Sequence, residues 1–253
     1  MNDSLEIRIH GETPRPTVIY FPGLHGDWTL CGRFRRKMLE RVRWVEFVYP
    51  KNTTWTLADH AVAAARLLKE NNITTGWLLG ESFGSQVMWA FLQGDGKNFA
   101  RNGIILAGGF VRYPYLPLVK LARFLCLLVP VWFWHFFLKL HVWYSRRYRA
   151  MTERDAEEML QRQWDAHRET YRHRLTLIIG NDPREVAGKI AGPLYHLSGR
   201  IDPIVPWQPV RNWLRRNCPG YVASKILPGD HNVLGSQPEA SAEQIWEWMG
   251  RKD

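Results

Sequence analysis

The stretch GWLLGESFGSQVMWAFL, residues 76–92, contains the strongest indication of the fold. A short apolar run at residues 76–79 predicts a strand, and residues 86–92 carry a helical pattern. Between them, residues 80–84 read Gly-Glu-Ser-Phe-Gly, which fits a sharp strand-to-helix turn that keeps a serine hydroxyl exposed. Glycines suit the flanks of such a turn because a Cβ atom has no room there. Ser82 is therefore a candidate nucleophile, and its alternative role is an ordinary helix N-cap.

Apolar runs and helical patterns alternate on both sides of this stretch. Strands are predicted at residues 5–10, 17–21, 43–49, 76–79, 103–107, 194–197 and 223–227. Helices are predicted at residues 57–71, 86–92, 152–174, 210–215 and 239–249. Alternation of this kind is typical of βαβ units, so we expect an α/β fold with a mostly parallel twisted sheet flanked by helices.

The middle of the chain interrupts this alternation. We expect a core in two halves, residues 1–110 and 190–253, and a mainly helical cap inserted at residues 111–189. Within the cap, residues 124–138 (FLCLLVPVWFWHFFL) form an apolar run of 15 residues. A transmembrane helix needs about 20 apolar residues, and here Lys120, Arg123 and Lys139 lie close to both ends of the run. A membrane-spanning helix is therefore not expected.

Composition and charge narrow the class of protein. The chain has 253 residues, of which 45% are hydrophobic and 23% charged, as in soluble globular proteins. Lys plus Arg number 34 and Asp plus Glu 24, a net charge of +10 that favours contact with polyanions. The three cysteines (Cys31, Cys126 and Cys218) form no CxxC pair, and residues 1–20 lack the apolar run of a secretory signal. A cytoplasmic location is expected.

Three further motifs accompany Ser82, each after a predicted strand. Residues 21–26 read Phe-Pro-Gly-Leu-His-Gly, residues 198–206 read SGRIDPIVP, and residues 228–232 read PGDHN. Together with the serine turn, they resemble the oxyanion loop, acid loop and histidine loop of the α/β-hydrolase family, in that family's chain order of nucleophile, acid and histidine. The resemblance spans residues 20–232 and implies the α/β-hydrolase fold with an inserted cap.

The resemblance also implies roles for individual residues. Ser82 would be the nucleophile, His231 the general base and then acid, and Asp202 the carboxylate that orients the imidazole. The backbone N–H groups of Leu24 and Phe83 would bind the oxyanion. These types suit the chemistry because serine attacks only when a neighbouring imidazole accepts its proton.

Other residues compete for these roles or for a metal. Asp182, Glu185 and Asp230 are rival carboxylates, although the first two lie in a loop that fits the acid pattern poorly. His25 is expected to be a structural loop residue. The remaining close histidine pairs, 135 with 141 and 167 with 173, are six residues apart, so they do not share a helix face as metal ligands would. No metal and no cofactor are expected.

Two functions are therefore carried forward. The first is a serine hydrolase that cleaves an ester or thioester with an apolar acyl group through an acyl-enzyme intermediate, beneath a cap that lines the acyl pocket. The second is a non-catalytic or weakly catalytic protein whose basic aromatic cap binds an anionic membrane or a partner through Trp132, Trp134, Trp143 and the arginines at 146, 147 and 149. Nucleic acid is not an expected partner, because the basic residues are spread over the chain without a recognised motif.

Overall fold

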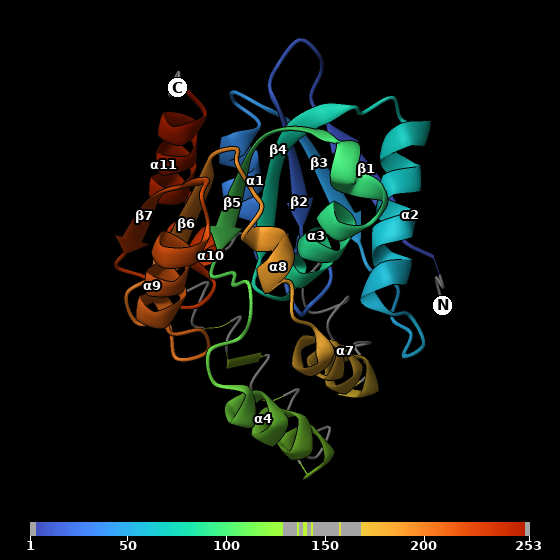
Figure 1. Ribbon diagram of the computed structural model, residues 1–253, viewed down its shortest axis with the longest axis vertical. Helices are drawn as coiled ribbons and strands as arrows, with labels where there is room; N and C mark the ends of the chain where they lie inside the picture. Colours follow the sequence, from blue (N-terminus) through green and yellow to red (C-terminus); the bar gives the residue numbers. More distant parts are fainter. Residues whose placement is uncertain are drawn as a thin grey trace.

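The computed structural model describes residues 4–128 and 168–250, together with the isolated positions 136, 139, 140, 143 and 157. This part of the chain contains a seven-stranded sheet with the order β1-β3-β2-β4-β5-β6-β7 (Figure 1). The strands are β1 (Glu6–His10), β2 (Thr17–Phe21), β3 (Arg43–Val48), β4 (Thr75–Glu81), β5 (Ala100–Ala107), β6 (Leu194–Gly199) and β7 (Tyr221–Leu227). Neighbouring strands are parallel except for β1, which pairs antiparallel with β3. The expected mostly parallel sheet is confirmed.

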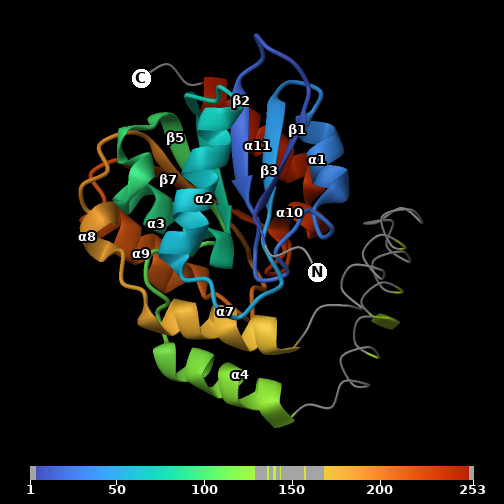
Figure 2. The same ribbon diagram turned by 90° about the vertical axis from the view of Figure 1, so that its right-hand side faces the viewer.

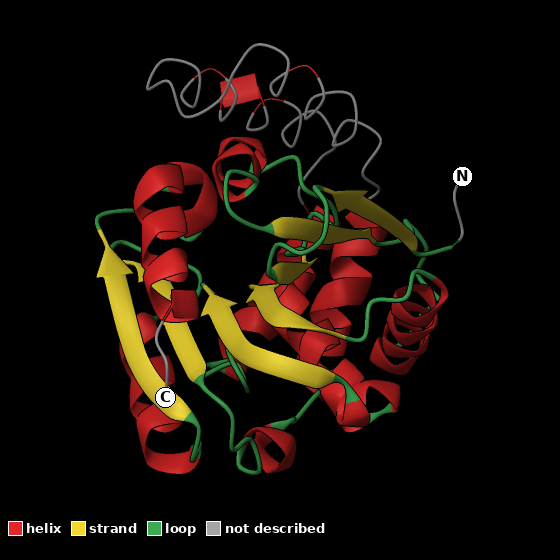
Figure 3. Ribbon diagram, turned by 90° about the horizontal axis from the view of Figure 1, so that it is seen from above, coloured by secondary structure: helices red, strands yellow, loops and turns green. Residues whose placement is uncertain are grey.

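Helices cover both faces of the sheet (Figure 3). The helices of the described part are α1 (Gly32–Met38), α2 (Leu57–Glu70), α3 (Phe83–Gln93), the 3-10 helix η1 (Asp95–Asn98), α4 (Leu116–Leu128), α7 (Arg168–Gly180), α8 (Arg184–Ala187), α9 (Trp207–Asn217), α10 (Val233–Ser236) and α11 (Pro238–Gly250). One core cluster joins the sheet to α2, α3 and α9, and a second joins its other face to α1, α10 and α11. The central strands are therefore buried on both sides, which explains their continuous apolar sequences.

Local sequence explains where several elements begin and end. At the start of α2, the Thr56 side chain accepts a hydrogen bond from the Asp59 N–H, and Asp59 in turn accepts from Thr56. The same helix ends at Glu70, and Asn71 is its C-cap, as predicted. Helix α1 was not predicted from the sequence. Its seven residues include four basic ones, and Phe34 and Met38 are its two large buried side chains.

Helix α7 differs from its predicted range. The sequence predicts a charged helix at residues 152–174, but residues 152–167, apart from position 157, lie outside the described residues. The described helix begins at Arg168 and runs six residues beyond the predicted end, to Gly180. Ile178 on this extra turn is buried in the main core cluster, so packing rather than surface charge determines where the helix ends.

Helices α4 and α7 lie side by side below the ends of the parallel strands (Figures 1 and 2). Two contacts fix α7 to the loop that follows β3. Thr170 Oγ1 donates to the Lys51 carbonyl at 3.2 Å, and a ring nitrogen of His173 lies 2.7 Å from the Trp55 carbonyl oxygen. Within the described residues, no helix is long and apolar enough to cross a bilayer.

Candidate active site

Ser82 lies at the turn between β4 and α3. Its backbone has φ 47° and ψ −118°, a region that is unfavourable for a residue with a Cβ atom. A Cβ atom added to Gly84 would lie 2.0 Å from the Phe21 carbonyl oxygen, and one added to Gly80 would lie 2.9 Å from the Ser85 Cα. Both glycines of the motif are therefore required by close backbone packing. Ser82 occupies the N-cap position of α3, but its side chain makes no capping hydrogen bond to the helix.

The Ser82 hydroxyl is hydrogen-bonded to His231, which follows β7. The distance from Ser82 Oγ to His231 Nε2 is 2.9 Å. The other ring nitrogen, Nδ1, lies 2.8 Å from Oδ2 of Asp202, in the loop after β6. Three side chains from separate strand ends thus form one hydrogen-bonded row in the order Ser82, His231, Asp202. Their catalytic roles stay a prediction.

The carboxylate of Asp202 is held in one orientation. Its Oδ1 accepts the backbone N–H groups of Ile204 and Val205, both at 2.8 Å, which leaves Oδ2 to face the imidazole. The side chain is fully buried, whereas that of His231 is 18% exposed. A buried carboxylate that accepts a hydrogen bond from Nδ1 favours the ring tautomer with a proton on that nitrogen, so that Nε2 can accept a proton from Ser82.

The rival carboxylates have other partners or lie at the surface. Asp182 forms ion pairs with Arg112 at 2.8 Å and Arg184 at 2.6 Å, and its hydrogen bond with Arg184 lowers the pKa of the carboxyl. Glu185 is exposed, and Asp230 is exposed although it precedes His231 in the sequence. Of the four candidate carboxylates, Asp202 is the one that is hydrogen-bonded to the His231 ring.

The two predicted oxyanion donors come from segments that pack against each other. Phe83 is the first residue of α3, so its N–H has no acceptor in a preceding helical turn. Leu24 lies in the loop after β2, where the Gly26 N–H donates to the Gly23 carbonyl at 3.0 Å. The close approach of Gly84 to the Phe21 carbonyl brings this loop against the start of α3. Their role as oxyanion donors stays a prediction.

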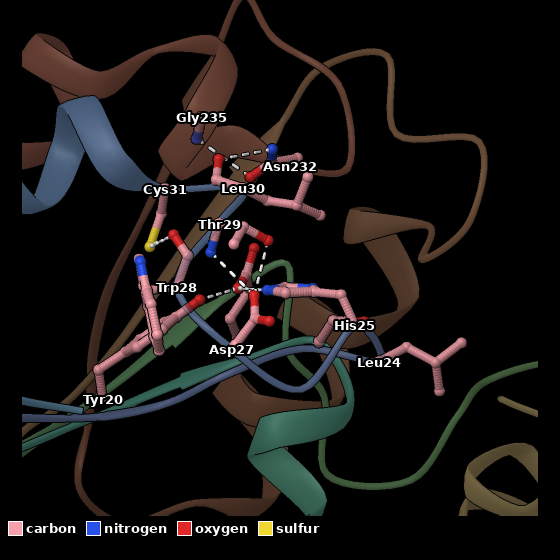
Figure 4. Close-up of polar contacts among 12 residues, drawn as sticks. Tyr20, Leu24, His25, Asp27, Trp28, Thr29, Leu30, Cys31, Asn232 and Gly235 are labelled. Carbon is pink, nitrogen blue, oxygen red and sulfur yellow. Dashed lines mark hydrogen bonds and ion pairs between the residues drawn. The ribbon is translucent and has the colours of Figure 1, made fainter. Parts of the chain in front are cut away.

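A buried polar cluster that the sequence does not reveal adjoins the turn at Ser82, and its members Tyr20 and His25 are labelled in Figure 4. Glu81 directly precedes Ser82, and its Oε2 accepts a hydrogen bond from the Tyr20 hydroxyl. Burial raises the pKa of Tyr20 well above its usual value, so the hydroxyl keeps the proton that it donates. Nε2 of His25 lies 3.9 Å from the same carboxylate oxygen. The one available signal was a charged residue, Glu81, at the end of an apolar strand.

Asn232 anchors the histidine loop to a neighbouring loop (Figure 4). Its Nδ2 donates to the Leu30 carbonyl at 3.1 Å, and its Oδ1 accepts the Gly235 N–H at 3.0 Å. Because Asn232 follows His231, these bonds restrict the backbone that carries the imidazole.

The described residues contain no group of three or more His, Cys, Asp or Glu side chains that could hold a metal ion. The polar side chains at the candidate site form the hydrogen-bonded row of Ser82, His231 and Asp202.

Comparison with known proteins establishes the fold. No protein-family model matches the chain, and no curated protein matches its sequence at a significant level. An esterase from Exiguobacterium antarcticum is 15% identical, with a TM-score of 0.77 over 98% of this chain and 96% of that one. An enol-lactonase from Burkholderia xenovorans is 16% identical, with a TM-score of 0.76 over the same shares. An alpha/beta hydrolase from a deep-sea metagenome is 12% identical, with a TM-score of 0.76 over 98% and 95%. The chain therefore has the α/β-hydrolase fold, as expected.

Identity this low speaks for the fold alone, since one fold serves many chemistries. The activity has to be argued from the residues of the candidate site.

Proposed function

We propose that this protein is a serine hydrolase that cleaves an ester or thioester with an apolar acyl group through an acyl-enzyme intermediate. The observation that carries the proposal is the hydrogen-bonded row of Ser82, His231 and Asp202 at a strained turn. Esterases and a lactonase among the structures of similar fold support it. In this proposal residues 111–189 form a cap on a core of residues 1–110 and 190–253.

In the first half-reaction, Ser82 Oγ attacks the carbonyl carbon of the substrate while its proton passes to His231 Nε2. The resulting oxyanion is bound by the N–H groups of Leu24 and Phe83. When the carbonyl re-forms, the bond to the leaving alcohol or thiol breaks, and that group takes the proton from His231. The acyl group is then esterified to Ser82.

In the second half-reaction, water attacks the acyl carbon and gives one proton to His231. The second tetrahedral intermediate collapses with cleavage of the bond to Ser82 Oγ, which receives the proton back. A carboxylic acid leaves, and the enzyme returns to its starting state. Asp202 stays ionised throughout and stabilises the imidazolium that forms twice in the cycle. These steps need no cofactor.

The test is covalent labelling with a fluorophosphonate probe, which reacts with an activated serine. We expect the wild type to be labelled and Ser82→Ala not to be. Ser224→Ala is a matched control, because Ser224 also lies beside an imidazole, with 3.1 Å between its Oγ and His196 Nδ1, but sits in a regular strand. A wild type that is not labelled, or labelling that survives Ser82→Ala, would overturn the proposal.

A series of p-nitrophenyl esters should show faster hydrolysis of acyl chains longer than acetyl, and a preference for the acetate ester would contradict the proposed apolar acyl group.

The alternative function, binding to an anionic membrane, is favoured by the outer face of α4. Val119 and Cys126 are 4% and 6% exposed on the side of α4 that faces the protein. On the opposite side, Leu121, Phe124 and Leu128 are 51–60% exposed. A continuous exposed apolar face of this kind marks an interaction site more often than an ordinary surface.

Charge points to an anionic lipid surface as the partner of this face. Residues 111–150 contain seven Lys and Arg residues and no Asp or Glu. Apolar side chains beside basic ones suit the boundary between anionic headgroups and acyl chains. Trp143 is 62% exposed, whereas Trp132, Trp134 and the arginines at 146, 147 and 149 lie outside the described residues.

Co-sedimentation with vesicles tests this second proposal. We expect the protein to bind phosphatidylcholine vesicles that contain phosphatidylserine, with weaker binding at high salt. Leu121→Glu should weaken binding about tenfold, because it places a charge in the apolar face. Val62→Glu is the matched control, since Val62 is 55% exposed on α2. Absence of lipid binding would overturn the proposal, and a dimer that Leu121→Glu dissociates would assign the face to a second copy of the chain.

A further inference from the structure

Arg174 is a buried cation directly beside the predicted oxyanion loop. It belongs to α7, in a segment whose sequence predicts a charged surface helix, yet it is only 3% exposed. Burial lowers the pKa of its guanidinium. The buried carboxylate of Asp27 attracts the guanidinium electrostatically. Burying a charge is costly, so the hydrogen bonds that hold the guanidinium in place need an explanation.

The hydrogen bonds of Arg174 are made to backbone carbonyls in the loops after β2 and β3. Nη1 donates to the Leu24 carbonyl at 2.6 Å, and Nη2 donates to the Pro50 carbonyl at 3.1 Å. The guanidinium carbon also lies 6.0 Å from the centre of the Phe83 ring. Arg174 thus hydrogen-bonds Leu24 and lies near the ring of Phe83, the two residues whose N–H groups are the predicted oxyanion donors.

Gly26 makes this approach possible. Its φ is +90°, and a Cβ atom there would lie 2.5 Å from Nη1 of Arg174. The Gly26 carbonyl accepts the Tyr49 N–H at 2.8 Å, and its own N–H donates to Gly23. The loop is therefore closed around the guanidinium, with the Leu24 carbonyl held from the side of α7.

We infer that Arg174 is a positioning residue for the oxyanion hole. By holding the Leu24 carbonyl, the guanidinium fixes the loop so that the Leu24 N–H keeps its orientation toward the developing negative charge. The inference rests on the proposed hydrolase function. The guanidinium donates to the two carbonyls from two nitrogens held in one plane, whereas the donors of a lysine rotate about a single nitrogen, so a lysine is a poor substitute.

A purely structural role would belong instead to the contacts that fix α7 in place. Thr170 and His173 bind the loop after β3 without touching Leu24. They keep α7 attached when Arg174 is replaced, and they provide a control. Thr170→Val removes a buried hydrogen bond of α7 but leaves the bond from Arg174 to Leu24.

The experiment compares Arg174→Met, Arg174→Lys and Thr170→Val in the full chain. For hydrolysis of p-nitrophenyl butyrate, we expect Arg174→Met to lower kcat about 10–100-fold, which is less than the loss of a whole oxyanion donor. KM should stay within about twofold, and the pH midpoint of kcat/KM should not move, because the His231–Asp202 pair is untouched. Affinity for a trifluoromethyl ketone, whose adduct with serine carries an oxyanion, should fall in parallel with kcat. Affinity for butyrate, the product, should not change.

Arg174→Lys should retain an intermediate kcat, and Thr170→Val should lower the melting temperature without changing affinity for the trifluoromethyl ketone. If Arg174→Met does not fold, the lysine variant supplies the same comparison. The inference is overturned by a folded Arg174 variant with wild-type kcat, or by an equal loss of ketone affinity in Thr170→Val.

Fluorophosphonate labelling of the wild type distinguishes failure of the hydrolase proposal from failure of the inference about Arg174. An unlabelled wild type removes the hydrolase proposal together with this inference, whereas a labelled wild type with an unaffected Arg174→Met removes this inference alone.

Discussion

Replacement of Asp202 by asparagine should abolish most activity while preserving the fold. Because Oδ1 accepts two backbone N–H groups, the asparagine oxygen must occupy that position, and its NH2 group must replace Oδ2. The NH2 group then faces His231 Nδ1 and forces that nitrogen to accept a hydrogen bond. The ring proton moves to Nε2, which can no longer accept the proton of Ser82.

The expected size of the effect follows from the same geometry. A carboxylate and an imidazolium about 4 Å apart attract each other by about 4 kcal/mol at an effective dielectric constant near 20. Two opposed donors in the productive tautomer cost about 1–3 kcal/mol more. The sum, about 5–7 kcal/mol, corresponds to a loss of about 10⁴-fold or more in kcat.

The assay is the rate of p-nitrophenyl ester hydrolysis and of fluorophosphonate labelling, with thermal unfolding as the check on folding. Asp230→Asn is the matched control, because Asp230 is exposed and adjacent to His231 in sequence, and it should stay within a few-fold of wild type. A folded Asp202→Asn protein within tenfold of wild type would refute the tautomer argument. A large loss in Asp230→Asn would point to the other carboxylate.

Three further predictions concern the scaffold. Gly84→Ala should destabilise the protein by about 3 kcal/mol or more in urea unfolding, because its Cβ would lie 2.0 Å from the Phe21 carbonyl oxygen; near-wild-type stability would contradict this. Burial lowers the pKa of both His60 and His196 to about 4, below the unfolded value of 6.5, so their full contribution to stability is present above pH 6.5 and is lost as the pH falls to about 4. Between pH 6.5 and about 4, protonation of each histidine should lower the free energy of unfolding by about 3 kcal/mol. In His196→Gln the free energy of unfolding should therefore depend less on pH than in the wild type. An unchanged pH dependence would contradict this prediction. Glu46→Gln removes the charge of a fully buried carboxylate that pairs with cationic side chains, and it should lower the free energy of unfolding by about 3–5 kcal/mol. Fluorophosphonate labelling of the folded fraction should not change. A small change in melting temperature would argue against a net contribution from these ion pairs.

Much of the fold could be predicted because its signals are local. Strand β2 has the predicted bounds, since TVIYF is buried on both faces and needs no polar residue. The other strands differ from prediction by at most three residues at either end. Helix α1 was missed because a seven-residue helix with two buried apolar side chains has too short a pattern.

The candidate site could be predicted only where a turn carries its own signature. The loops around Ser82, Asp202 and His231 follow strands that end at one edge of a parallel sheet, so topology brings them together. Arg174 could not be predicted, because the sequence contains many arginines and no local pattern distinguishes the buried one. Its partner is a backbone carbonyl 150 residues away in the chain, and backbone groups leave no trace in the sequence.

The separation of Ser82 from His231 by 149 residues has a consequence for biosynthesis. At about 5–20 residues per second, a ribosome adds the histidine roughly 7–30 s after the serine. Throughout that interval the nascent polypeptide holds a serine that lacks its proton acceptor. Under the proposed mechanism, reactivity toward acyl compounds arises only after β7 has been synthesised and has joined the sheet.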